Sequence, residues 1–334
     1  MGSRLGQPLR ERIIARIVRI LSAVLLLGAL VAIGEEKRLP TVAVLNPAPP
    51  VAHFQTVIGE VLRQLGYEPG RNLVYYERWA GGSEEQLRRD AAEIVKLKVD
   101  AIQAGSSAAV RAALNATKTI PIVAVDLESD PVANGWAASL GSPGGNLTGF
   151  FLDLPALYGK RLEQLKEILP GLNTVAVLWD AALDRVPLRA TEAAAKALSM
   201  RMVTLEVRRP EELEGAFRRA IKERAQAILI SGSPMIDGAA SKIAALAIRH
   251  KLPSAGFFPI HAESGFLMSY GPDVDDLIRR SFVYIDRVLK GEKPRGLPIQ
   301  RPSKFDMILN VKTANALGIT FPQNLVVQAD RVIK

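Results

Sequence analysis

The pentapeptide Thr-Val-Ala-Val-Leu occurs twice in this chain, at residues 41–45 and again at 174–178. Three further segments return after the second copy in the same order and at similar spacing: 61–66 as 194–199, 100–106 as 226–233, and 120–124 as 252–256. A chain that repeats its elements in this way uses one supersecondary module more than once. We therefore expect two similar lobes with a space between them.

Short apolar runs alternate along the chain with stretches whose apolar residues recur at helical spacing. The predicted strands are 42–45, 72–77, 101–104, 122–125, 137–140, 175–178, 202–207, 227–230, 254–257, 266–269 and 305–309. The predicted helices are 51–65, 84–97 (with Ser83 as N-cap), 107–115, 188–198, 211–222, 239–249 and 276–289. This order predicts an α/β fold of two similar doubly wound parallel-sheet lobes joined by hinge crossovers.

A glycine-rich segment, 141–149, lies between the two copies of the module. It matches neither glycine pattern that binds phosphate, and its composition predicts an irregular crossover. We interpret Gly144, Gly145, Asn146 and Gly149 as hinge residues. Lobe 1 is predicted to comprise 38–148 plus about 271–298, and lobe 2 to comprise 149–270 plus about 299–334.

The first 34 residues form a separate segment. Arginines precede an apolar run over 20–34, and small residues at Ala32 and Gly34 suit a cleavage site. This arrangement predicts a secretory signal peptide and a periplasmic location. An uncleaved membrane anchor and a core helix are the alternatives, although the run is short for a spanning helix.

Several classes of chemistry are excluded by composition. The chain has no cysteine, and its three histidines, His53, His250 and His261, have no partner at metal-ligand spacing. No serine-nucleophile motif occurs. Of the net charge of +9, residues 1–34 carry +4, so the remainder of the chain is only mildly basic. We expect no enzyme activity, no metal, no cofactor and no nucleic-acid partner.

Ligands of open α/β sheets bind beyond the carboxyl ends of the strands. The candidate ligand-binding residues at those positions are Asn46, Pro47, Ser106, Ser107, Asp126, Trp179, Asp180, Ser231, Ser233, Phe257, Phe258 and Tyr270. The serines and Asp180 have a second interpretation as helix caps, and the aromatic residues have one as lobe core. The sequence leaves both interpretations open.

The chain also resembles a known family in six segments: 62–73, 139–149, 159–165, 267–272, 288–294 and 310–318. They include Ser-Pro-Gly-Gly-Asn-Leu-Thr-Gly at 142–149 and Gly-Lys-Arg-Leu-Glu at 159–163. The resemblance is to ABC transporter substrate-binding proteins of the tryptophan/tyrosine type, which have the class I periplasmic-binding-protein fold. It implies a monomeric receptor that closes two lobes on a solute and docks on a membrane permease driven by an ATPase.

The sequence departs from that family at three turns expected to contact ligand: 105–108, 179–181 and 232–235. The second is Trp-Asp-Ala where the family commonly has Asn-Pro-Asn. We therefore expect a small organic solute, an amino acid or another carboxylate-bearing molecule, aromatic ones included. A solute-sensing module for a membrane signalling partner is the alternative function, and an α/β enzyme is a third.

Overall fold

The computed structural model describes the chain except residues 1–37, 48, 51, 126–129, 153 and 182–184. The predicted signal peptide and Asp126 therefore lie outside the described residues. The folded unit runs from Thr41 to Lys334. Within the described part of the chain, no helix has the length and apolarity that a membrane span requires.

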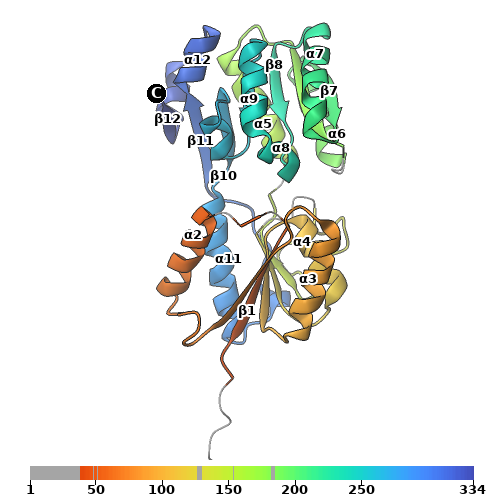
Figure 1. Cartoon of the computed structure of the whole chain (residues 1–334), viewed down its shortest axis with the longest axis vertical. Coiled ribbons are helices and arrows are strands. Elements are labelled where there is room, and N and C mark those ends of the chain that lie inside the picture. The colour runs from red at the N-terminus through yellow and green to blue at the C-terminus, as the bar shows by residue number, and fades with distance from the viewer. Residues whose placement is uncertain (1–37, 48, 51, 126–129, 153, 182–184) are drawn as a thin grey trace, which may run out of the picture. The chain divides into compact units, whose positions relative to one another are not determined.

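The unit contains two sheets (Figure 1). The first has five strands in the order β2-β1-β3-β4-β5, and all its pairings are parallel. The second has seven strands in the order β12-β11-β10-β9-β8-β6-β7, parallel except for the β10–β11 pair. The strands are β1 (Thr41–Asn46), β2 (Val74–Trp79), β3 (Ala101–Ala104), β4 (Ile122–Ala124), β5 (Leu147–Gly149), β6 (Thr174–Asp180), β7 (Arg201–Val207), β8 (Ala227–Ile230), β9 (Ser254–Gly256), β10 (Met268–Pro272), β11 (Phe305–Asn310) and β12 (Arg331–Ile333).

The repeated pentapeptide begins the first strand of each sheet. The strand β1 lies between β2 and β3, and β6 lies between β7 and β8. Read from β2, the first sheet has the order 2-1-3-4-5, and the second begins with the equivalent order 7-6-8-9-10. The prediction of two similar α/β lobes is confirmed, and β11 and β12 extend the second sheet.

The first sheet is covered by helices on both faces. The helices α3 (Glu84–Lys96) and α4 (Ser107–Ala116) bury one apolar cluster with Leu87, Ile94 and Val110. On the other face, α2 (Ala52–Gln64) and α11 (Val274–Leu289) bury a second cluster. The helix α11 is far from α2 in sequence but packs beside it, so the chain returns to the first sheet after β10.

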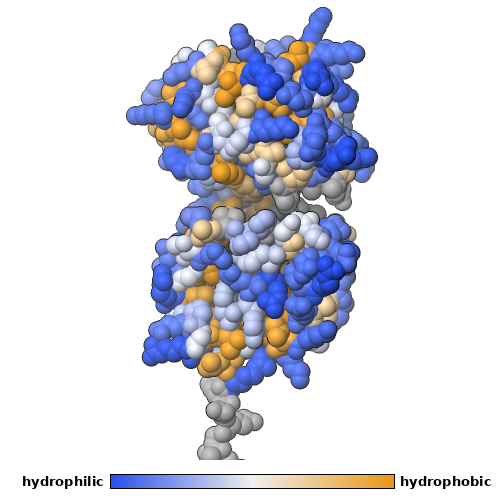
Figure 2. Space-filling view, in the orientation of Figure 1, coloured by the Kyte–Doolittle hydropathy of each residue, from blue (hydrophilic) through white to orange (hydrophobic). Residues whose placement is uncertain are grey.

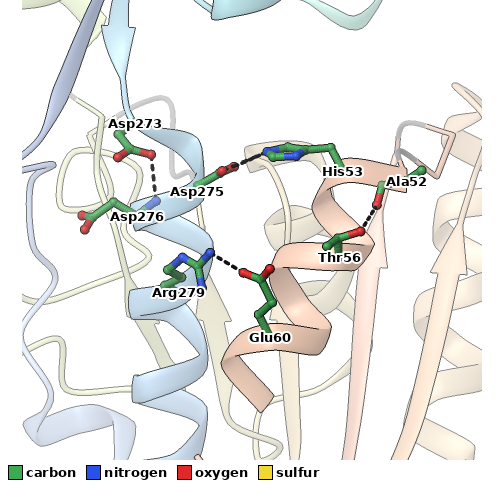
Figure 3. A network of polar contacts seen from close by, with 8 residues as sticks. All are labelled: Ala52, His53, Thr56, Glu60, Asp273, Asp275, Asp276 and Arg279. Carbon is green, nitrogen blue, oxygen red and sulfur yellow. Dashed lines mark hydrogen bonds and ion pairs between the residues drawn. The ribbon is translucent and has the colours of Figure 1, made fainter. Parts of the chain in front are cut away.

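Polar contacts along the solvent side of the α2–α11 pair join the two helices (Figure 3). Arg279 donates to Glu60 at 2.7 Å, and His53 Nε2 lies 2.9 Å from Asp275. The hydrogen bond from Arg279 holds the pKa of Glu60 below its usual value. The carboxylate of Asp273 accepts from the Asp276 N–H at 2.9 Å and so caps α11 where the chain leaves β10.

The second sheet is covered in the same way. One face packs against α5 (Leu154–Ile168), α6 (Val186–Ala197), α12 (Val311–Leu317) and α13 (Gln323–Gln328). The other packs against α7 (Leu213–Lys222), α8 (Pro234–Gly238) and α9 (Ala240–Arg249). The short helix α10 (Pro259–Glu263) and the 3-10 turns η1 (Pro210–Glu212) and η2 (Pro294–Gly296) complete the elements. The predicted lobe limits stay a prediction.

The charged face of α3 is exposed to solvent. On α3, Arg88 and Arg89 pair with Glu84 and Glu85 one turn earlier, and all four side chains are more than half exposed. The outer helices in Figure 2 carry mostly hydrophilic residues, with hydrophobic ones interspersed. These exposed pairs contribute little to stability.

Two predictions for residues 137–149 are wrong. No strand forms over 137–140; instead β5 forms inside the glycine-rich segment that we expected to be wholly irregular. Leu147 and Thr148 are buried, and the open edge of β4 supplies the hydrogen-bonding groups. Asn146 Nδ2 also donates to Ile120 O at 2.8 Å. Tertiary pairing therefore overrides the local glycine signal.

Candidate ligand-binding site

The carboxyl edge of the first sheet brings two predicted residues together. Asn46 ends β1, and its side chain lies over Gly105, the residue that follows β3. A Cβ at Gly105 would stand 2.5 Å from Asn46 Nδ2, so a larger residue at this position would displace the Asn46 amide. Ser106 comes next along the chain. Pro47 lies beyond β1 and accepts a hydrogen bond from the Gly82 N–H at 2.7 Å.

Ser106 is the N-cap of α4. Its Oγ accepts from the Ala109 N–H at 3.4 Å, and its backbone is extended. Ser107, the first helical residue, is 3% exposed. The capping interpretation of Ser106 is confirmed. A ligand at this edge would therefore meet a Ser106 hydroxyl that already accepts a hydrogen bond from the backbone of α4.

Replacement of Ser106 by alanine is expected to lower the free energy of unfolding by about 1 kcal/mol, since the cap hydrogen bond is lost. Ser106→Asp, which retains a capping oxygen, is expected to stay close to the wild-type value. Urea unfolding followed by circular dichroism measures both. Equal stability of the alanine and aspartate variants would show that the cap contributes nothing.

The prediction that Trp179 and Asp180 form a turn after the first strand of lobe 2 is wrong. Both residues belong to β6 and pair with Glu206 and Val207 of β7. Trp179 is 1% exposed, and its ring lies 6.1 Å from that of Tyr158 on α5. Hydrogen bonding to β7 extends the strand further than the apolar run predicted.

Ser231 and Ser233 also form structural contacts. The Asp180 N–H donates to Ser231 Oγ at 3.1 Å, and both residues are buried. Ser233 is the N-cap of α8, and its Oγ accepts from the Ile236 N–H at 3.2 Å. These hydroxyls fix the ends of β6 and β8 relative to α8.

The predicted aromatic residues lie near the carboxyl edge of the second sheet. Phe257 is 2% exposed, and its ring meets Tyr158 edge-on at 5.0 Å. Phe258 is half-buried and stacks on His261 at 5.9 Å. Tyr270 is half-buried and stacks on Phe305 at 5.8 Å. Burial raises the pKa of Tyr270, against the opposing effect of Lys160, so it stays neutral at physiological pH.

Two buried residues here were not among the predicted ligand-binding residues. His261 is fully buried, with Nδ1 accepting from the Phe258 N–H at 3.0 Å and Nε2 directed at Asp237 at 3.0 Å. Arg161 on α5 is also fully buried, against the rings of Phe257 and Tyr158. Burial lowers the pKa of Arg161 to about 9, and Tyr158 opposes the shift.

The available signal for Arg161 was the Gly-Lys-Arg-Leu-Glu segment, which matched the family. Its mixed charges resemble a solvated helix face, so the sequence alone gave no reason to bury one of them. No group of His, Asp and Glu side chains capable of holding a metal occurs among the described residues.

Two doubly wound sheets, with polar residues at the carboxyl edge of the first and polar and aromatic residues near that of the second, define a two-lobed binding-protein fold of class I. Residues 42–333 match the family described as ABC transporter substrate binding protein. The chain belongs to this family, which is non-catalytic, in agreement with the prediction that it is not an enzyme.

A relative from Clostridioides difficile (strain R20291), a tyrosine-binding protein, is 24% identical over 264 residues, covering 78% of this chain and 75% of the relative. Two solved structures share the fold with TM-scores of 0.80, and each match covers 88% of this chain and 100% of the other. One is a conserved domain protein from Vibrio cholerae, at 24% identity. The other is an ABC domain in complex with L-Trp from Streptococcus pneumonia, at 22% identity.

Proposed function

We propose that this protein is the extracytoplasmic receptor of an ABC importer, capturing a small organic solute between its two lobes. The solute is an amino acid or another carboxylate-bearing molecule, aromatic ones included. The loaded receptor delivers it to a membrane permease driven by an ATPase. Residues 1–34 direct the chain to the periplasm as a signal peptide, and the folded protein acts as a monomer.

The observation that carries this proposal is the repeated sheet order together with the family match over nearly the whole folded unit. The carboxyl edges of both sheets hold candidate ligand residues, with Asn46 and Ser106 on the first. Phe258 and Tyr270 occupy the second. The relatives whose names mention tyrosine and L-Trp favour an aromatic amino acid as the first solute to test.

Closure requires crossovers that change their backbone angles while each lobe stays rigid. The predicted hinge residues Gly144, Gly145 and Asn146 lie between β4 and β5, which pair in the first sheet, so rotation there would not move one lobe against the other. Gly149 ends β5 and is held against Ala124 of β4, so of the four predicted hinge residues it alone borders the segment in which the chain leaves the first sheet.

Purified protein is expected to unfold at a higher temperature in the presence of its solute. A ligand at 100 times its Kd stabilises a folded protein by about 2.7 kcal/mol, which raises Tm by several degrees. The measurement is a thermal-shift screen of amino acids, organic acids, amines and sugars, beginning with L-tyrosine and L-tryptophan. A panel in which no solute raises Tm would contradict the proposed function.

Transport and sensing are distinguished by the membrane protein that the solute-loaded receptor activates. The solute-loaded receptor is expected to stimulate ATP hydrolysis by its permease complex in proteoliposomes. Stimulation of a membrane kinase in its place would favour the signalling module.

A further inference from the structure

The guanidinium of Arg161 is buried, and among the described residues no acidic side chain pairs with it. Its side chain has 0% exposure, and within the described part of the chain none of Nε, Nη1 and Nη2 has a hydrogen-bond acceptor of normal geometry, although Tyr158 lies close enough to interact with it. The guanidinium contacts ring faces instead: Cζ lies 3.1 Å from the centroid of Phe257 and 4.6 Å from that of Tyr158. A ring face interacts favourably with a cation but does not accept all five N–H groups of arginine.

This arrangement is costly for the fold. An unpaired buried charge destabilises a protein, and a cation–ring contact offsets only part of that loss. An apolar side chain of the same volume would fill the position better. Arg161 is therefore poorly explained as a packing residue.

The location of Arg161 connects it to the carboxyl edge of the second sheet. A short connection joins the end of α5 to the start of β6, so α5 begins at the carboxyl edge and runs antiparallel to β6. Side chains on a helix point back toward its N-terminus. The guanidinium is thus directed toward the edge at which ligands of open α/β sheets bind.

A second donor without an acceptor lies in the same cluster. Among the residues that the structure describes, the buried Nε1–H of Trp179 has no hydrogen-bond acceptor, and the Trp179 ring contacts that of Tyr158, against which Arg161 stacks. Both unmatched groups are donors only. Their complement is an anionic oxygen group, and the planar fork of a guanidinium matches the two oxygens of a carboxylate.

We propose that Arg161, assisted by the Nε1–H of Trp179, binds the carboxylate of the solute in lobe 2. This inference rests on the proposed function and deepens it, because it assigns the solute to the carboxylic acids and names the residue that selects them. The long arginine side chain moves its head group from the Phe257 face toward the edge when the carboxylate arrives. Neutral sugars and amines lack the group that this donor pair requires.

The first test measures the ligand-free protein. Arg161→Met replaces the charge by an apolar side chain, and its Tm is expected to equal or exceed that of wild type. The matched control is Arg218→Met, which removes an exposed arginine from α7. A Tm for Arg161→Met well below that of both wild type and the control would assign Arg161 a structural role and overturn the proposal.

The second test measures binding by calorimetry with paired probes: L-tyrosine with tyramine, L-tryptophan with tryptamine, and L-phenylalanine with phenethylamine. Succinate, inorganic phosphate and glucose complete the set. The wild-type protein is expected to bind the amino acid of at least one pair but not the matching amine, which lacks the carboxylate. Arg161→Met should weaken that acid at least about 100-fold, the usual effect of removing one partner of a buried charged pair.

Two further variants sharpen the result. Arg161→Lys is expected to bind the acid with an affinity between those of wild type and Arg161→Met, since lysine retains the charge without the planar fork of arginine. Trp179→Phe is expected to weaken it by roughly 10-fold, the loss of one hydrogen bond to a charged group. Arg218→Met should leave affinity unchanged.

The outcomes separate this inference from the proposed function. Acid binding that survives in Arg161→Met, equal binding of acid and amine, or wild-type binding of only glucose or phosphate would overturn the carboxylate role of Arg161 while leaving a solute receptor. If wild type binds no probe and no solute of the wider thermal-shift panel, the proposed function and this inference both fail.

Discussion

Replacement of Gly149 by alanine is expected to reduce the free energy of unfolding by about 4 kcal/mol or to abolish soluble expression. Gly149 ends β5 with φ +131°, a conformation that side chains rarely adopt. An added Cβ would stand 2.2 Å from Ala124 O and 2.5 Å from Ala124 N. Neither atom can move, because both belong to the backbone of the buried strand β4.

The matched control is Gly145→Ala in the same glycine-rich segment. Gly145 has an ordinary φ, and its Cβ would meet nothing within 4 Å, so the change is expected to stay within about 0.5 kcal/mol. Guanidinium unfolding followed by tryptophan fluorescence measures both variants. If Gly149→Ala were as stable as Gly145→Ala, the close contact between β5 and β4 would be refuted.

Replacement of Trp179 by alanine is expected to cost about 3–5 kcal/mol, the usual loss for a large aromatic side chain in a core. Its indole is 1% exposed and packs with Tyr158 and the rest of the apolar cluster between α5 and the second sheet. Trp179→Phe fills most of the same volume and is expected to lose less than half as much.

A half-buried tryptophan provides the comparison. Trp136 packs at the margin of the first lobe's core, so Trp136→Ala is expected to cost less than Trp179→Ala. Chemical denaturation of the variants gives the ranking. A small loss of stability in Trp179→Ala would contradict the conclusion that Trp179 is chiefly a core residue.

Local signals in the sequence predicted much of this fold. The doubled pentapeptide located the first strand of each sheet, because five buried residues in a row are typical of a central parallel strand. Ser83 and Ser106 located the starts of α3 and α4, since capping depends on residues only three positions apart. The helix α11, which follows residue 270, packs on the first sheet, while the full limits of the two lobes stay a prediction.

Candidate site residues were predicted less completely. Strand ends placed Asn46 and Ser106 at one edge, and Phe257, Phe258 and Tyr270 near another. The sequence could not separate a ligand contact from a cap or a core residue at those positions. That distinction depends on burial and partners supplied by elements far along the chain.

The sequence by itself determined the repeated module, the alternation of strands and helices, and the helix caps, because each depends on residues near one another in the chain. Only the tertiary structure decided that β5 pairs with β4, that Trp179 belongs to a buried strand, and that Arg161 is enclosed by Tyr158 and Phe257. Pairing and burial are properties of neighbours in space, and a residue's local sequence does not specify which distant segment will cover it.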